Sequence, residues 1–333
     1  MLDYSPYESV SPQSLRPGPF ITYADRGLLT MSSSTSSYPT LPPKLILTST
    51  KAYFSPSRTI NYLNSILDTQ NNKILSLLSS HRDQVRFVLI PDFLTIFPCS
   101  QILTTRFSTP SDSSSSSSWP VSLGAQNAFQ STSYGAYTGE IVPPALKELG
   151  CSVVELNHAE RRRMLGETDE TAAAKASAVC ALGMIPLVCI GEVERPPQNG
   201  PLSQSVGLAM AQLTPQIETL LRAVPSDAPV IFAYEPVWAI GAAEPAGVDY
   251  VGPVVQAIRE VARRAVPGGR SGPVKVVYGG SAGPGLWSGK ANGGNGLGKY
   301  VDGLFLGRFA HEVSGVSAVV EEVVESLNSN SQS

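Results

Sequence analysis

Short apolar runs rich in β-branched residues recur from Lys44 onward and alternate with longer stretches of mixed polarity. Each run is too short for a helix and is typical of a buried strand. The expected strands are 45–47, 86–90, 121–125, 153–156, 186–190, 230–233, 274–278 and 303–306. Apolar residues in the longer stretches recur at helical spacing, so the pattern predicts strands and helices in regular alternation.

The longer stretches are expected to be helices that connect consecutive strands. Their ranges are 59–79, 170–182, 202–223 and 248–266. Alternating strands and helices imply right-handed crossovers and a parallel sheet. Eight such units predict a closed α/β barrel of the (β/α)8 type rather than an open sheet. No Gly-x-Gly-x-x-Gly opens the first unit, which argues against a dinucleotide-binding fold.

Polar segments of low complexity flank and interrupt this pattern. Residues 1–43 are rich in Ser, Pro, Thr and Tyr, and we expect a disordered extension with Met31 as an alternative start of translation. The barrel domain is expected to span 44–327, followed by a disordered tail at 328–333. The serine run 113–118 falls within 107–120, which we interpret as a solvated loop insertion.

Composition narrows the class of protein. Hydrophobic residues make up 42% of the chain and charged residues 15%, which suffices for a large core. A formal net charge of −3 does not favour a nucleic-acid partner. Apolar runs are too short for a membrane span and the N-terminus lacks a secretory signal pattern, so we expect a cytoplasmic protein. The four cysteines show no paired metal-ligand spacing, and we expect no metal site.

Three residues with complementary chemistry follow the expected strands. Lys51 lies just past the first strand, His158 past the fourth and Glu235 past the sixth. Because the carboxyl ends of barrel strands meet at one face, these side chains are expected to converge. A carboxylate can take a proton next to a carbonyl, an imidazole can serve the oxygens, and an ammonium can stabilise the enediolate. His81 and His311 lack such a context and are interpreted as surface or structural residues.

Six motifs surround these residues and extend along the expected barrel. They are GAYTGE at 135–140, LNHAERR at 156–162, CIGE at 189–192, YEPVWAIG at 234–241, YGGS at 278–281 and VDG at 301–303. In order and spacing they resemble the triosephosphate isomerase family over nearly the whole barrel. The resemblance implies a TIM barrel and an aldose–ketose isomerase that acts on a small phosphorylated sugar without a metal or organic cofactor.

The resemblance also implies a role for each matching residue. Glu235 is the expected base and His158 the neutral electrophile. Lys51 is expected to stabilise the anionic intermediate, and Glu160 to complete the polar network. The expected substrate-binding residues are Ser49, Gly241, Gly280, Ser281, Gly307 and Arg308. The segment from Pro236 onward is the expected lid, which excludes water.

One loop of the family projects into the site of a second subunit. Thr138 lies in the matching loop of this sequence. The resemblance therefore implies a homodimer that assembles through the loop containing Thr138.

Five departures from the family pattern surround the expected substrate site. Ser49 stands where the family has Asn, Asn157 where it has Gly, and Ala159 where it has Ser. The second lid hinge, usually Thr-Gly-Lys, reads Ala-Ala-Glu at 242–244. Arg308 replaces the second Gly of a pair whose amides face phosphate in the family. Its guanidinium could bind phosphate or an additional substrate hydroxyl.

Several functions remain open at this point. The leading expectation is the isomerisation of dihydroxyacetone phosphate to D-glyceraldehyde 3-phosphate in glycolysis and gluconeogenesis. The grouped departures favour an alternative, an erythrulose-phosphate isomerase of tetritol catabolism. A second alternative is a non-catalytic barrel that binds sugar phosphate, which the retention of Lys51, His158 and Glu235 disfavours. A third is an interaction protein that acts through residues 1–43.

Overall fold

The structure, a computed structural model, describes residues 38–107, 119–197, 199–241, 245–290 and 292–330. Eight parallel strands close into a barrel in their order along the chain. They are β1 (Lys44–Ser49), β2 (Val85–Ile90), β3 (Val121–Ala125), β4 (Cys151–Leu156), β5 (Ile185–Ile190), β6 (Val230–Tyr234), β7 (Val274–Tyr278) and β8 (Gly303–Leu306). The barrel closes where β1 pairs with β8, with Leu45 opposite Gly303. The predicted (β/α)8 barrel is therefore confirmed.

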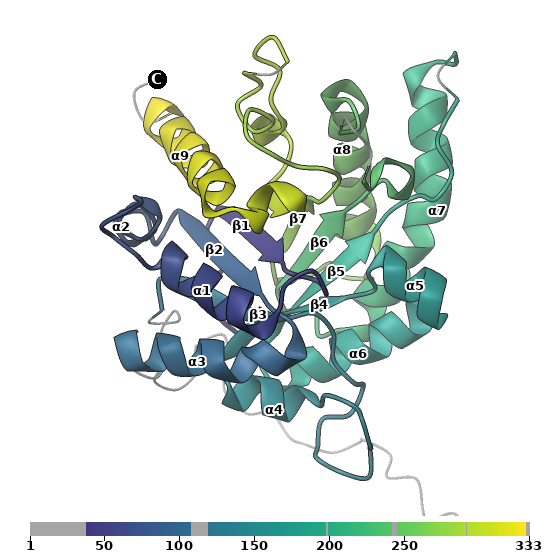
Figure 1. The fold of residues 1–333 in the computed structure, drawn as a ribbon. Coiled ribbons are helices and arrows are strands. Elements are labelled where there is room, and N and C mark those ends of the chain that lie inside the picture. The colour runs from purple at the N-terminus through teal and green to yellow at the C-terminus, as the bar shows by residue number, and fades with distance from the viewer. Residues whose placement is uncertain (1–37, 108–118, 198, 242–244, 291, 331–333) are drawn as a thin grey trace, which may run out of the picture. The chain divides into compact units, whose positions relative to one another are not determined.

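Helices cover the outside of the barrel (Figure 1). They are α1 (Pro56–Ile66), α2 (Ile74–Ser80), α3 (Phe93–Phe107), α4 (Pro143–Glu148), α5 (Ala159–Leu165), α6 (Asp169–Ala181), α7 (Leu202–Ala223), α8 (Val248–Arg264) and α9 (Val313–Asn330). Within the described ranges, none of them combines the length and the apolar character needed to cross a bilayer.

The prediction of one helix over 59–79 is wrong, because the structure divides this stretch into α1 and α2. Between them, the Asp68 carboxylate accepts hydrogen bonds from the backbone N–H of Gln70 and from Asn71 Nδ2. Local bonds of this kind offer the backbone an alternative to the helix. The periodic apolar residues continue across the turn and concealed it.

Two layers of apolar side chains fill the protein. Leu45 and Leu47 of β1 point into the barrel, whereas Ile46 packs against the surrounding helices. Both faces of the strands are therefore buried, which explains why they read as continuous apolar runs. Glu155 is an exception on β4, since it is only 3% exposed and lies at the inward position two residues after Val153.

Three expected domain boundaries differ from the structure. The barrel domain begins before residue 44, because Tyr38 is buried in its outer core. At the other end, α9 continues to Asn330, beyond the expected boundary at 327. The insertion expected at 107–120 is shorter, since Phe107 still belongs to α3 and Trp119 is buried. The serine run 113–118, residues 1–37 and residues 331–333 lie outside the described residues.

Candidate active site

The carboxyl ends of the strands surround a cavity of about 460 Å³. It brings together most of the predicted site residues: Ser49, Lys51, His158, Glu160, Glu235, Gly241, Ser281, Gly307 and Arg308. Gly280 is not among the lining residues and packs against Tyr278, whereas its neighbour Gly279 lines the cavity. Among the described residues, no group of three His, Cys, Asp or Glu side chains is placed to hold a metal ion.

Lys51 follows β1 in a left-handed backbone conformation, with a φ of 47°. This conformation is unfavourable for a residue with a Cβ and persists where neighbours hold it. Here Gln126 Nε2 donates to the Lys51 carbonyl at 3.0 Å, and the Lys51 ammonium lies 2.9 Å from Glu160 Oε1. Burial lowers the pKa of Lys51, but the hydrogen bond with Glu160 and the charge of Glu235 raise it above its ordinary value. A stable cation therefore faces the cavity, where it can offset enediolate charge.

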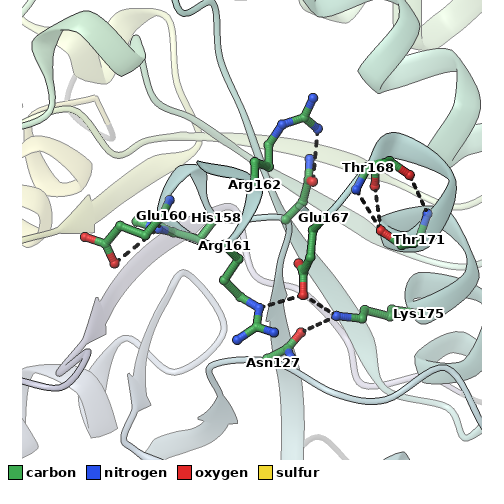
Figure 2. A network of polar contacts seen from close by, with 10 residues as sticks. Asn127, His158, Glu160, Arg161, Arg162, Glu167, Thr168, Thr171 and Lys175 are labelled. Carbon is green, nitrogen blue, oxygen red and sulfur yellow. Dashed lines mark hydrogen bonds and ion pairs between the residues drawn. The ribbon is translucent and has the colours of Figure 1, made fainter. Parts of the chain in front are cut away.

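His158 caps the N-terminus of α5, and Figure 2 shows it beside Glu160. Its Nδ1 accepts a hydrogen bond from the Glu160 backbone N–H at 3.1 Å, so the neutral ring carries its proton on Nε2. Burial, and then the Lys51 ammonium, lower the pKa of His158 to about 4. Nε2 lies 3.5 Å from Glu235 Oε2. The ring is thus a neutral donor next to the carboxylate, and it can polarise a carbonyl oxygen.

Glu235 follows β6 and is only 5% exposed. Its carboxylate packs against Gly279, where an added Cβ would lie 2.5 Å from Glu235 Oε1. Burial raises the pKa of Glu235 to about 8, with Lys51 opposing the rise and Glu155 and Glu160 adding to it. A buried carboxyl group with a raised pKa is a strong base once it ionises. A carboxyl group with a raised pKa and a neutral ring N–H therefore lie 3.5 Å apart at the ends of β6 and β4.

The loop after Glu235 is anchored at its first turn by Glu192. Trp238 Nε1 and the Tyr250 hydroxyl each donate to Glu192 Oε1 at 2.8 Å. The Glu192 carbonyl accepts a hydrogen bond from Val237 N. A fixed point of this kind suits the first hinge of a lid. The second expected hinge, 242–244, lies outside the described residues.

The exposed rim of the cavity offers groups suited to an anion. Gly241 and Ser281 have left-handed conformations, with φ angles of 74° and 49°. Arg308 opens the short 3-10 helix η3 (Arg308–His311), and its Nη2 donates to the Gly241 carbonyl at 3.4 Å. Turns with such conformations can present backbone N–H groups to an anion, and a guanidinium adds charge and donors. These groups could bind an anion such as a phosphate.

The sequence did not reveal four residues at or near the cavity. Tyr53, Phe309 and His311 line it. The ring of His311 lies between those of Tyr53 and Phe54, at centroid distances of 5.2 and 5.1 Å. His311, which was interpreted as a surface or structural residue, therefore contributes to the cavity wall and packs against two aromatic rings. Glu155 is the fourth residue. A carboxyl group within an otherwise apolar strand was the feature of the sequence that could have indicated it.

A separate polar network holds α5 against its neighbours (Figure 2). Arg161 Nε donates to Glu167 Oε1 at 2.7 Å, and Lys175 Nζ donates to the same oxygen. Lys175 also donates to Asn127 Oδ1 at 3.1 Å. These contacts tie α5 to α6 and to the loop after β3. They hold in place the helix whose first turn positions His158.

Comparison with known proteins agrees with this geometry. The sequence profile described as triosephosphate isomerase matches residues 44–323, which include every strand of the barrel. The chain belongs to the triosephosphate isomerase family. The family resemblance of the six motifs is thereby confirmed, and the chain is a sugar-phosphate isomerase.

Individual relatives within the triosephosphate isomerase family differ in their named substrate. The chain is 38% identical over 274 residues to L-erythrulose-1-phosphate isomerase from Pectobacterium atrosepticum, covering 82% of this chain and 93% of the relative. It is 39% identical over 253 residues to the L-erythrulose-1-phosphate isomerase of Rhizobium etli, covering 74% and 82%. Identity to triosephosphate isomerase from Chlamydia caviae is 35% over 238 residues, covering 70% and 82%.

One departure from the triosephosphate isomerase pattern has a simple structural basis. Asn157 has a φ of 64°, a conformation that Gly adopts freely and Asn tolerates better than most residues. Its Nδ2 donates to the Cys189 carbonyl and its Oδ1 accepts from Arg162, so the side chain is held on both sides. Nothing in the structure explains Ala159 in place of Ser.

Proposed function

We propose that the chain interconverts L-erythrulose 1-phosphate and erythrulose 4-phosphate through an enediolate. Two relatives named L-erythrulose-1-phosphate isomerase are 38% and 39% identical to the chain, whereas the triosephosphate isomerase from Chlamydia caviae is 35% identical. The structural observation that carries the proposal is Ser49, a small buried residue on the cavity wall where the family has the longer Asn. A shorter side chain at this position leaves space for one more carbon atom.

The chemistry of this substrate fits the proposed catalytic groups. The carbonyl of L-erythrulose 1-phosphate is at C2, and the C1 oxygen is esterified with phosphate. The carbonyl can therefore move only to C3, which carries a free hydroxyl. Compared with a triose phosphate, the molecule has one additional hydroxymethyl group at the end remote from the phosphate. The reaction links two ketoses and requires a base, a proton donor and stabilisation of negative charge.

In the proposed reaction, Glu235 takes the proton from C3, and the electrons of the C3–H bond form the C2=C3 double bond. His158 donates its Nε2 proton to O2 and then takes the proton of the C3 hydroxyl. Glu235 returns its proton to C2 as the carbonyl forms at C3. The Lys51 ammonium, held by Glu160 at 2.9 Å, stabilises the negative charge on the oxygens.

The phosphate of the substrate is proposed to bind at the rim, on Gly241, Ser281, Gly307 and Arg308. Gly241 and Arg308 are exposed, whereas Ser49 is buried two residues before Lys51 and on the same strand end. A phosphate at the rim therefore directs the opposite end of the sugar inward, toward Ser49. The additional hydroxymethyl group then lies against the inner wall.

Dihydroxyacetone phosphate is the second candidate substrate, because Lys51, His158 and Glu235 could act on it in the same way. The test compares kcat/KM of the purified full-length chain on the two compounds. We expect at least about a tenfold preference for L-erythrulose 1-phosphate, the scale on which pockets separate substrates that differ by one small group. A preference for the triose would overturn the proposal in favour of triosephosphate isomerase activity.

The variant Glu235→Gln serves as the matched control for catalysis. Its amide cannot accept the carbon-bound proton, so turnover of both substrates should be lost while competitive binding of inorganic phosphate persists. Retained turnover would contradict the assignment of Glu235 as the base. A wild-type chain that binds phosphate but turns over neither compound would support the non-catalytic barrel.

We further propose that the chain forms a homodimer through the loop that contains Thr138. Large apolar side chains are exposed on this loop and on α3, with Tyr134 at 58%, Leu94 at 78% and Phe97 at 55%. Exposed apolar groups of this size are typical of surfaces that bind a partner. Light scattering on the purified chain should give twice the mass of the monomer, and a monomeric mass would exclude this assembly.

A further inference from the structure

Two buried polar atoms near the carboxyl end of the barrel make no well-formed hydrogen bond among the described residues, although they belong to residues that interact with each other. They are Ser49 Oγ and Glu155 Oε2, and their residues are 4% and 3% exposed. The surrounding interior is apolar, with Val153 and Leu187 close by in the same inner layer. A buried carboxyl oxygen without a well-formed hydrogen bond is costly. The proposed reaction gives Glu155 no role, so these groups require another explanation.

Ser49 lines the cavity and its hydroxyl interacts with the buried Glu155 carboxyl group. Glu155 is an inward residue of β4 and pairs in register with Leu187 of β5. Burial raises the pKa of Glu155 to about 7, and the nearby Ser49 hydroxyl and Lys51 ammonium oppose the rise. Ser49 lines the cavity, whereas Glu155 does not. A contact between Glu155 and a ligand in the cavity would therefore pass through Ser49.

We propose that Ser49 is the residue that selects the terminal hydroxymethyl group of the substrate, and that Glu155 positions the Ser49 hydroxyl. The inference rests on the proposed tetrulose phosphate substrate. With the substrate bound, Ser49 donates its proton to the Glu155 carboxylate. An oxygen lone pair of Ser49 then faces the cavity and accepts a hydrogen bond from the C4 hydroxyl.

This arrangement distinguishes a tetrulose phosphate from a triose phosphate, because the smaller substrate leaves a hydrogen-bonding group of the site unpaired. A triose phosphate has no C4 hydroxyl, so it leaves Ser49 without its ligand bond and leaves the space beside it empty. Sites that hydrogen-bond a substrate hydroxyl reject analogues that lack it more strongly than purely apolar pockets do. Glu155 is a positioning residue in this scheme, because it acts on the substrate only through Ser49.

The test compares substrate selectivity, the ratio of kcat/KM on L-erythrulose 1-phosphate to that on dihydroxyacetone phosphate, in four full-length variants. Glu155→Val and Ser49→Ala each remove one partner of the proposed pair. Glu155→Gln keeps an amide oxygen that can accept the Ser49 proton. Glu322→Gln is the control, because Glu322 is equally buried and bonds the backbone of Gly285 and Ser288 rather than lining the cavity.

We expect Glu155→Val and Ser49→Ala to lower the selectivity ratio by about 10- to 100-fold, the effect of losing one buried hydrogen bond. The loss should fall on the tetrulose, with little change for the triose. Glu155→Gln and Glu322→Gln should keep the ratio within about threefold of the wild type.

An equal loss on both substrates, or an unchanged ratio in Ser49→Ala, would overturn the inference. If Glu155→Val does not fold, Ser49→Ala and Glu155→Gln decide the outcome. Failure of the proposed function is seen separately, because the wild-type chain would then prefer the triose or turn over neither compound. A wild type that prefers the tetrulose, combined with an unchanged ratio in Ser49→Ala, would refute the inference alone.

Discussion

The acid limb of the pH–rate profile tests the environment of Glu235 directly. Burial holds the pKa of Glu235 at about 8 in the substrate-free chain. The carboxyl group must be ionised to accept a proton, and kcat/KM reports the ionisation of the free enzyme. We therefore expect kcat/KM to fall about tenfold for each pH unit below 8, to about one tenth of its plateau at pH 7. His158 does not add to this limb, because its pKa is about 4.

The assay measures initial rates at limiting substrate between about pH 5.5 and 9.5. A phosphate monoester has its own ionisation near pH 6, so the slope is read between about pH 6.5 and 8. The charged groups that set the pKa of Glu235 are Lys51, Glu155 and Glu160. Glu155→Gln removes one neighbouring negative charge and should move the limb to lower pH, whereas the remote control Glu322→Gln should leave it in place.

Two results would refute this reasoning. A plateau in kcat/KM that extends unchanged from pH 8 to about 6.5 would show that burial does not hold Glu235 protonated. A limb at the same pH in the wild type and in Glu155→Gln would show that the two carboxyl groups are not coupled.

Three further predictions follow from the same contacts. Gly279→Ala places a Cβ 2.5 Å from Glu235 Oε1, so kcat should fall about 100-fold with an unchanged circular dichroism spectrum, and near-normal turnover would contradict this packing. Arg308→Gly should raise KM about tenfold and weaken inhibition by inorganic phosphate equally, whereas an unchanged KM would place Arg308 outside the phosphate site. The pKa of Glu155 rises from 4.5 to about 7 on folding, so its contribution to stability is present below pH 4.5 and is lost as the pH rises through 7. Linkage gives about 3 kcal/mol, so the melting temperature of Glu155→Gln should rise relative to the wild type between pH 5 and 8, and a constant difference would contradict a raised pKa.

The barrel could be predicted from the sequence because local pattern and tertiary structure agree. Strands such as 230–233 are buried on both faces, so they appear as uninterrupted apolar runs. The break between α1 and α2 was missed because the local pattern and the structure disagree there. Ile74 and Leu78 continue the helical spacing of Ile66 and pack in the same core, although a turn separates them. Spacing alone does not distinguish one helix from two that bury the same side.

Lys51, His158 and Glu235 could be predicted because each follows a strand and lies in a recognisable motif. His311 was missed because it reaches the cavity through a short 3-10 helix, a position that no local pattern indicates. Glu155 could have been found, since period-two alternation from Val153 places it inside the barrel. Its closeness to Ser49 and Glu235 could not, because three strands distant in sequence must first be assembled.

Catalysis and substrate choice depend on different parts of this cavity. In the proposed reaction, proton transfer between adjacent carbons needs Lys51, His158 and Glu235, and these groups could serve a triose and a tetrulose phosphate alike. The additional carbon contacts neither the base nor the rim that we assign to phosphate. In the proposed binding mode it fits against the inner wall, where the chain has Ser49 in place of Asn and the buried Glu155 carboxyl group nearby. On the proposed function, substitutions on the inward faces of β1 and β4 change the substrate while the catalytic groups remain unchanged.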